Sequence, residues 1–416
     1  MIFLLLACGS PLDPAQKGDT GAPTPDDTAT DSSPPDDSAT DSTPPDDTAT
    51  DSGGDTATPP DPDDPAFLFG AVTHDLALTL DAAALAALAA DPREDVHATL
   101  SYDGQSWDVG LHLKGSASFR DLSGKASFKI DAHQWDPDQR FFGLKRLTLN
   151  NMIQDATMSS EHLSYELHGR MGRVAPRHGY ARVTVNGELF GLYGLVEAVD
   201  DDLLERAFPG DDEGNLYEGG YGGDFTEGCA PLFTQSEGTD ESLADLNAVI
   251  DAVLASSPET YTDLLGTFFD LDALLDVWAV ELVTSNNDAY TSLGNNFFVY
   301  HATAGDQWTM IPWGPDQAFA GAEPVAGPYY GALAARCAEA PACADRLAER
   351  VEAVLEVWEA TDFAGYVEAE TVRIEDDCRT DPRSEWGDYG CRDALIDLRA
   401  WAADRPAVVR AEGTGG

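Results

Sequence analysis

Residues 181–196 read ARVTVNGELFGLYGLV, and this stretch decides the first half of the fold. Its Asn186-Gly187 dipeptide strongly favours a two-residue hairpin turn. Apolar side chains recur on both sides of the dipeptide with the spacing of a strand. The sequence therefore predicts two antiparallel strands, 181–186 and 189–196, joined by this turn.

Alternating segments extend the pattern upstream of the hairpin. Turns at Asp103-Gly104 and Ser123-Gly124 separate the first three of four such segments, which cover 96–102, 107–114, 126–130 and 144–149. Short alternating runs divided by glycine turns predict an antiparallel meander. A strand-like run over 66–80 comes first, and Asp81 would cap the short helix that follows it.

Helical spacing dominates downstream of the hairpin. One helix is expected earlier, over 160–171, and three more over 243–254, 271–283 and 342–361. A single hairpin, 297–300 with 308–313, is embedded among them. The predicted fold class is α+β, with a β-rich half over about 66–200 and a helical half over about 201–410.

Charge and composition exclude several classes of protein. The 416 residues carry 24 Lys and Arg against 75 Asp and Glu, a formal net charge of -51. Such a chain repels nucleic acids and anionic membrane surfaces, which bind proteins through Lys and Arg. After the first ten positions no apolar run reaches the roughly twenty residues of a membrane-spanning helix. The acidity indicates either a solvated surface or a basic protein partner.

The first eight residues, MIFLLLAC, resemble the signal of a bacterial lipoprotein, with Leu5-Leu6-Ala7-Cys8 as the lipobox. This resemblance implies cleavage before Cys8 and a lipid on its sulfur, so that the protein is exported and touches a membrane only through this anchor. The alternative is a truncated start that happens to contain a cysteine. Residues 9–65 are rich in Asp, Pro, Thr and Ser, with a period of ten, and predict a disordered, extended tether.

Five cysteines follow Cys8. Cys337 and Cys343 are close in sequence, and Cys378 and Cys391 flank a turn-rich stretch, so an exported protein is expected to form two local disulfides. Zinc binding is the weaker alternative, because no histidine lies near either pair. Cys229 is left over.

A lysine-rich glycine turn is the first candidate site. Lys114-Gly115-Ser116-Ala117-Ser118 is followed by Lys125, and such a turn can hold phosphate through backbone N–H groups, hydroxyls and ammonium groups. Taken alone, the segment favours the alternative, an exposed turn with solvated lysines. Glu197 ends the second strand of the hairpin, where ligands often bind, although it could be a solvated acid.

Acidic and amide residues downstream form the second candidate site. Asp288 is followed by Asn295 and Asn296, and Asp316 follows the next predicted strand. An Asp can accept a hydroxyl proton while Asn and a second Asp hold a divalent ion, as in phosphoryl transfer. Asx-rich turns are common in loops that bind nothing, which is the alternative for both segments.

The order of these segments is that of the parts of a protein kinase, and residues from about 70 to 321 resemble the CotH kinase family. The resemblance rests on Lys114–Ser118 with Lys125, on Pro176-Arg177, on residues 185–193, on Glu197, on Asn286–Asp288 with Asn295-Asn296, and on Pro312–Phe319. It implies an atypical protein-kinase-like fold of two lobes. It also implies transfer of the γ-phosphoryl group of ATP to Ser or Thr of a protein, with Mg²⁺ or Mn²⁺.

The resemblance assigns a role to each candidate. Asp288 is the expected base, and Asp316, Asn295 and Asn296 are the expected metal ligands. The expected nucleotide-binding residues are Lys114, Ser116, Ser118, Lys125 and Glu197.

Three departures from the family pattern bear on activity. Gly314 stands where the family has an Asp, Lys114 replaces an Arg, and Ser159, Ser160 and Glu161 occupy a region where an Arg is expected. The first removes a carboxylate from the expected metal site. An inactive, kinase-like surface protein is therefore the alternative to an active kinase, and another transferase is a third reading.

Overall fold

The computed structural model describes residues 64–413, apart from 221, 240–241 and 322–324. Cys8 and nearly all of the predicted tether lie outside the described residues. Seven strands of the first half close into a barrel in the order β1-β2-β3-β4-β5-β7-β6. They are β1 (Thr73–Thr79), β2 (Val96–Tyr102), β3 (Gln105–Lys114), β4 (Ser127–Asp131), β5 (Arg146–Asn150), β6 (His178–Val185) and β7 (Glu188–Glu197).

The predicted meander and hairpin are both present. Strands β2 to β5 pair antiparallel in sequence order, and β6 pairs antiparallel with β7 across Asn186-Gly187. Both turn residues have positive φ, 51° and 82°, as a type I′ turn requires. The barrel closes because β1 lies antiparallel to β2 on one side and parallel to β6 on the other. Asp81 caps α1 (Ala82–Ala90) by accepting the N–H of Ala84 at 2.8 Å.

Alternate residues of the strands fill the barrel. Leu100, Val109, Leu111, Phe128 and Leu149 have no exposed surface, and they belong to one hydrophobic cluster that the barrel encloses. The residues between them face outward, so the period of two that predicted the strands also places their side chains.

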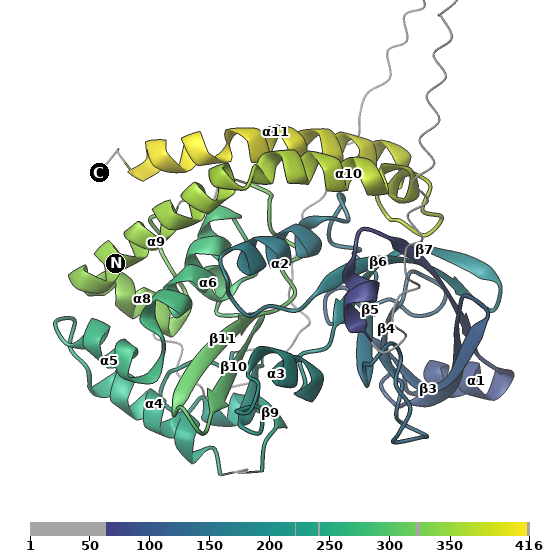
Figure 1. Ribbon diagram of the computed structural model, residues 1–416, viewed down its shortest axis with the longest axis horizontal. Helices are drawn as coiled ribbons and strands as arrows, with labels where there is room; N and C mark the ends of the chain where they lie inside the picture. The colour runs from purple at the N-terminus through teal and green to yellow at the C-terminus, as the bar shows by residue number, and fades with distance from the viewer. Residues whose placement is uncertain (1–63, 221, 240–241, 322–324, 414–416) are drawn as a thin grey trace, which may run out of the picture. The chain divides into compact units, whose positions relative to one another are not determined.

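Helices and a second sheet make up the rest of the chain (Figure 1). The helices are α2 (Ser160–Arg170), α3 (Asp201–Ala207), α4 (Ala244–Ala255), α5 (Tyr261–Phe268), α6 (Leu271–Val283), α7 (Tyr290–Leu293), α8 (Ala332–Glu339), α9 (Pro341–Ala360), α10 (Phe363–Arg379) and α11 (Gly387–Gly413). Helix α6 packs against α9, and α10 runs beside α11 (Figure 1). Their largest cluster centres on buried Trp278, Trp358 and Phe363.

The second sheet has four strands in the order β11-β10-β8-β9. Strands β10 (Phe297–Ala302) and β11 (Gln307–Pro312) form the predicted hairpin. The sequence did not predict β8 (Asn215–Gly219) or β9 (Phe233–Glu237). Each has five residues, which is too short for a clear alternation, and β8 runs directly into glycines. The α+β class, with a β-rich first half and a helical second half, is confirmed.

Both expected disulfides are present. Cys337–Cys343 joins α8 to α9, and Cys378–Cys391 joins α10 to α11. Cys229 is buried, and the Thr226 hydroxyl donates a hydrogen bond to its sulfur at 3.0 Å. Among the described residues, no helix has the length and apolar character needed to cross a membrane.

Candidate functional site

Three parts of the fold bring the candidate residues together. Lys114 is the last residue of β3, Glu161 lies in the first turn of α2, and Asp288 and Asp316 lie beyond α6 and β11. Helix α2 contacts both β6 of the barrel and α6 of the helical half. It therefore links the two halves of the fold at the site.

The connection after α6 positions Asp288. Gly294 ends α7 with a positive φ of 63°, and Asn296, at φ 55°, turns the chain into β10. These left-handed positions are taken by Gly and Asn, the residues that adopt them at least cost. The Asn296 carbonyl then accepts the N–H of Trp313 at 3.1 Å. This bond holds the segment that follows Asp288 against the segment that leads to Asp316.

Asp288 is surrounded by amide groups. Asn295 Nδ2 donates to one carboxylate oxygen at 3.0 Å, and Gln317 Nε2 donates to the other at 3.1 Å. Asn296 Nδ2 donates to the Asp288 carbonyl at 2.8 Å. The structure thus brings together Asp288, Asn295 and Asn296 as the sequence predicts, and it adds Gln317. This carboxylate is held in place by neutral donors, which leaves its charge unneutralised.

The side-chain oxygen atoms expected to bind a metal ion accept no hydrogen bonds from the described residues. Within the described part of the chain, the Asp316 carboxylate accepts no hydrogen bond, and neither does the side-chain oxygen of Asn295 or Asn296. Carboxylate and amide oxygens are the ligands that Mg²⁺ takes in proteins, together with phosphate oxygens and water. The donor set therefore fits Mg²⁺ or Mn²⁺.

Burial and neighbouring charges act on Asp316. Burial, together with the negative charges of Glu161, Asp155 and Asp288, raises the pKa of Asp316 to about 7. Lys114 opposes them with one positive charge. An ion bound here would relieve the repulsion that keeps the Asp316 carboxyl protonated near neutral pH.

Gly314 leaves room where the family pattern has a carboxylate. Its φ is +53°, and a Cβ atom there would lie 3.7 Å from Asn296 Oδ1, an ordinary van der Waals distance. The missing side chain would therefore have pointed at an expected metal ligand. The backbone N–H of Gly314 is bound by the Tyr165 hydroxyl at 3.0 Å.

The glycine turn holds Lys114 at the edge of this group. Lys114 Nζ donates to Asn150 Oδ1 at 2.5 Å and lies 5.4 Å from the centroid of the Trp313 ring. Burial lowers the pKa of Lys114, while the charge of Glu161 raises it. Gly115 has a φ of +108°, and a Cβ there would meet Ser118 Oγ at 2.9 Å, so the turn requires glycine.

The two serines of the turn differ in exposure. Ser116 is exposed and Ser118 is half-buried. The Ser118 carbonyl accepts the side-chain amide of Asn151 at 3.0 Å, which ties the turn to the end of β5.

Glu161 and Tyr165 belong to the site but were not selected from the sequence. Glu161 is 3% exposed and accepts Asn150 Nδ2 at 2.7 Å and the Tyr165 hydroxyl at 3.3 Å. Burial raises the pKa of Glu161, and the charge of Lys114 lowers it. The sequence signal was present, since Glu161 was singled out as a departure from the family pattern, but its contacts come only from the packing of α2 against the barrel.

Lys125 lies in a different environment from Lys114. Its ammonium group is fully buried and pairs with Asp381 at 2.6 Å, beyond the end of α10. Burial lowers the pKa of Lys125, and Asp381 raises it. The structure gives no support to a role for Lys125 in binding phosphate, because its charge is already matched inside the fold.

Glu197 is also matched internally. Its carboxylate has no exposed surface, and its oxygens accept hydrogen bonds from Arg177 and Arg206 at 2.7 and 2.8 Å. These two guanidinium groups use both oxygens, so the structure does not support contact between Glu197 and a nucleotide base.

One further acidic cluster lies on α3. Among the described residues, only Asp200, Asp201 and Asp202 bring three ligand atoms of His, Cys, Asp or Glu within 4.8 Å of one another. Lys145 and Arg146 pair with these carboxylates. Each of the three carboxylates therefore has a cationic partner within the chain, and Asp200 serves the start of α3 by accepting the N–H of Asp202.

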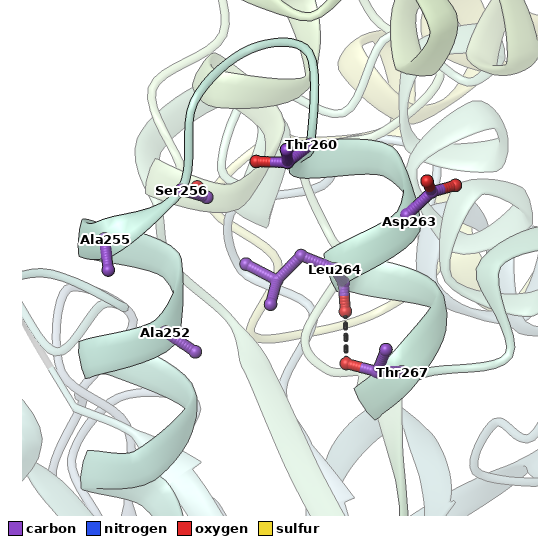
Figure 2. Close-up of a pocket in the computed structure, with 7 residues that line it drawn as sticks. All are labelled: Ala252, Ala255, Ser256, Thr260, Asp263, Leu264 and Thr267. Atoms are coloured by element: carbon purple, nitrogen blue, oxygen red, sulfur yellow. Dashed lines mark hydrogen bonds between the residues drawn. The ribbon is translucent and has the colours of Figure 1, made fainter.

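Two surface pockets lie away from the candidate site residues. One, of about 450 Å³, is a shallow depression between α4 and α5 that Figure 2 shows, lined by Ala252, Ala255, Ser256, Thr260, Asp263, Leu264 and Thr267. A second of about 230 Å³ lies between α6 and β11. Neither contains a candidate residue or a charged cluster suited to phosphate.

Comparison with known proteins agrees with the order of these parts. Residues 111–409 match the family described as CotH kinase protein. The chain belongs to the CotH family. The match begins in β3 and ends in α11, so every candidate residue from Lys114 to Asp316 lies inside it, as do α10 and most of α11.

A curated member of the CotH family supports the assignment. The inner spore coat protein H of Bacillus subtilis (strain 168) is 23% identical over 232 residues. The alignment covers 54% of this chain and 62% of that protein. This chain thus matches somewhat less than two thirds of the relative's length.

Proposed function

We propose that this CotH family protein transfers the γ-phosphoryl group of a nucleotide, ATP in the first instance, to a Ser or Thr hydroxyl of a protein. The observation that carries the proposal is the set of unneutralised oxygens around Asp288 and Asp316, with one ammonium group, Lys114, opposite them. Phosphoryl transfer needs a proton acceptor, a divalent-ion site and a phosphate-binding cation in one place.

In the proposed reaction, Asp288 accepts the proton of the substrate hydroxyl. The hydroxyl oxygen forms a bond to the γ-phosphorus, the bond from that phosphorus to the bridging oxygen breaks, and the nucleoside diphosphate leaves. Asn295 and Gln317 orient the Asp288 carboxylate without neutralising it. An oriented carboxylate of this kind is suited to accept the hydroxyl proton.

Asp316, Asn295 and Asn296 would hold Mg²⁺ or Mn²⁺, whose charge would offset that of the nucleotide phosphates. Lys114, with Ser116, Ser118 and the backbone of the glycine turn, would bind the phosphates from the barrel side. In this arrangement the barrel and the helical half act as the two lobes of a protein-kinase-like enzyme, with α2 between them.

The proposed location is the cell envelope. An exported protein with a lipid on Cys8 and an acidic tether would place the folded part outside the cytoplasm. The relative's name, which places that protein in a spore coat, supports a surface location. Roughly −37 of the formal charge belongs to the chain beyond residue 65, which favours a basic protein as the substrate.

The test is phosphorylation by the full-length protein. We expect transfer of label from ATP to a basic protein, dependent on Mg²⁺ or Mn²⁺ and abolished by a chelator. Calorimetry should show nucleotide binding only when a divalent ion is present. No heat of binding at millimolar nucleotide would contradict the proposal.

A second function is supported by Gly314. Because this residue lacks the family's carboxylate, the site has one acidic ligand fewer, and the protein could act at the surface by binding alone. In that case the folded protein would capture a basic protein partner without nucleotide. The calorimetric experiment separates the two functions, since only the first requires nucleotide.

A further inference from the structure

A single hydroxyl group joins the two sides of the candidate site. Tyr165, on α2, is 4% exposed. Its hydroxyl donates to Glu161 Oε1 at 3.3 Å and accepts the backbone N–H of Gly314 at 3.0 Å. Gly314 precedes Asp316 by two positions. One oxygen therefore contacts Glu161, on the side of the site that contains Lys114 (the phosphate side), and the segment that leads to Asp316 (the metal side).

Polar contacts continue from Glu161 to the glycine turn. Asn150 Nδ2 donates to Glu161 Oε2 at 2.7 Å, while Asn150 Oδ1 accepts Lys114 Nζ at 2.5 Å. The Lys114 ammonium group in turn lies 5.4 Å from the centroid of the Trp313 ring, and Trp313 adjoins Gly314. The contacts form a closed ring that passes through the barrel, α2 and the end of β11.

The backbone explains why this ring depends on Tyr165. The N–H of Trp313 still pairs with the β10 side of the hairpin, at the Asn296 carbonyl. Gly314 lies two residues after the end of β11 and has a φ of +53°. Its N–H is therefore turned toward α2, and the Tyr165 hydroxyl is the acceptor that it meets.

From this geometry we infer that Tyr165 is a positioning residue, which holds the Gly314–Asp316 segment in register with Glu161 and Lys114. Hydrogen bonds in such buried networks strengthen one another, and an unmade one is costly. The metal side and the phosphate side of the site are thus fixed to each other through α2. The consequence for nucleotide binding rests on the proposed function, whereas the positioning itself does not.

The test compares full-length Tyr165→Phe with Tyr261→Phe. Tyr261 is a matched control, because its buried hydroxyl donates to the Leu333 carbonyl at 2.8 Å and lies on α5, outside the site. Without nucleotide, we expect amide hydrogen exchange at Gly314 to become about tenfold faster in Tyr165→Phe, the effect of losing one buried hydrogen bond. Exchange at Gly314 should stay unchanged in Tyr261→Phe.

Nucleotide affinity in the presence of Mn²⁺ provides the second readout. It should fall about tenfold in Tyr165→Phe and not in Tyr261→Phe. If the parent binds no nucleotide, the proposed function fails, and exchange at Gly314 still decides the role of Tyr165.

Unchanged exchange at Gly314 in folded Tyr165→Phe would overturn the inference. If Tyr165→Phe does not fold, Glu161→Gln replaces it, since an amide cannot accept hydrogen bonds from both Tyr165 and Asn150 in the same way. Exchange at Gly314 should then rise by about threefold, and the absence of any rise would be equally decisive against the inference.

Discussion

Lys114 and Lys125 come from the same segment of sequence, yet their side chains lie in different charge environments. Lys125 and Asp381 have no exposed side-chain surface and pair with each other at 2.6 Å. Asp381 also accepts the N–H of Leu192 at 2.9 Å. A Cβ at Gly191 would lie only 2.2 Å from Asp381 Oδ2, so the barrel leaves a space shaped for this carboxylate.

The surroundings of Lys114 are not balanced in this way. The Lys114 ammonium group interacts with the charges of Glu161, Asp316 and Glu218, and with the like charge of Lys129. Asp316 is also repelled by Asp155 and Asp288, and burial together with the nearby negative charges raises its pKa to about 7. A buried charge with a matched partner serves the fold. Carboxylates in excess of the available cations instead indicate a site that takes a cation from outside the chain, together with its phosphates.

The sharpest way to break this comparison is to remove the proposed base. Asp288→Asn should lower phosphoryl transfer by roughly 10²–10⁴-fold, the usual contribution of such a group. Nucleotide affinity, measured by calorimetry, should stay close to that of the parent, because the proposed reaction assigns Asp288 to the hydroxyl rather than to the phosphates. Asp306→Asn, an exposed carboxylate on the β10–β11 turn, is the control and should keep full activity. Equal activity of Asp288→Asn and the parent would exclude Asp288 as the base.

Changes at the Lys125–Asp381 pair should act on stability. Lys125→Met or Asp381→Leu leaves one uncompensated buried charge, so either should lower the free energy of unfolding by about 3–5 kcal/mol. The double variant should recover much of that loss, because no charge remains buried. Denaturant unfolding of the two single variants and the double variant measures the coupling.

Lys114→Met provides the contrast for that experiment. It should lower the free energy of unfolding by about 1 kcal/mol or less, because removing the charge relieves desolvation of the half-buried Lys114 side chain and so offsets most of the lost hydrogen bond to Asn150. Its main effect should be weaker nucleotide binding in calorimetry. Destabilisation as large as that of Lys125→Met would mean that the two lysines do not differ in role.

The parts of this molecule that sequence could predict are those that depend on local patterns. The Asn186-Gly187 hairpin, helix α6 and both disulfides follow from turn chemistry, periodicity and cysteine spacing. Asp288 and its amide partners could be selected together because they lie close in sequence.

Residues whose role depends on a distant partner could not be predicted. The partner of Lys125 lies beyond α10, in the helical half, and nothing near Lys125 in sequence indicates an enclosed ion pair. Tyr165 has the spacing of an ordinary helix residue, and its importance comes from the backbone of Gly314, which packing brings beside it. Glu197 looked like a ligand-binding acid because its two arginines are not adjacent in sequence.

The unbalanced charge near Lys114 should reduce stability, and Asp316→Asn measures by how much. The pKa of Asp316 is about 7 in the folded protein, against about 3.9 in an unfolded chain. Between these values the folded form holds the proton more tightly, so stability falls as pH rises toward 7.

Without divalent ions, Asp316→Asn should therefore be more stable than the parent at pH 8, by roughly 1–2 kcal/mol after allowing for partial exposure and screening. The gain should shrink toward pH 5, where the parent carboxyl is already protonated. Added Mn²⁺ should stabilise the parent and not the variant, in thermal melts with and without the ion. A parent stability that does not change between pH 5 and pH 8 relative to the variant would contradict the raised pKa.

Gly314→Asp tests whether a metal ion balances the excess of carboxylates near Lys114, because it adds one carboxylate to the site. The left-handed φ of +53° costs an L-residue about 1 kcal/mol, and Asp is among the residues that tolerate it best. The new Cβ would lie 3.7 Å from Asn296 Oδ1 without a clash, so the carboxylate would enter the expected metal site.

Without ions, the Gly314→Asp variant should be slightly less stable than the parent, since it adds one more negative charge beside Asp316. Gly314→Ala places a Cβ at the same left-handed position and adds no carboxylate, which makes it the control. Mn²⁺ should bind Gly314→Asp about three- to tenfold more tightly than Gly314→Ala, because Mg²⁺-type sites use one or two carboxylates. Equal affinities would place the ion away from Asn296 and would leave the charge excess around Lys114 without a metal ion to balance it.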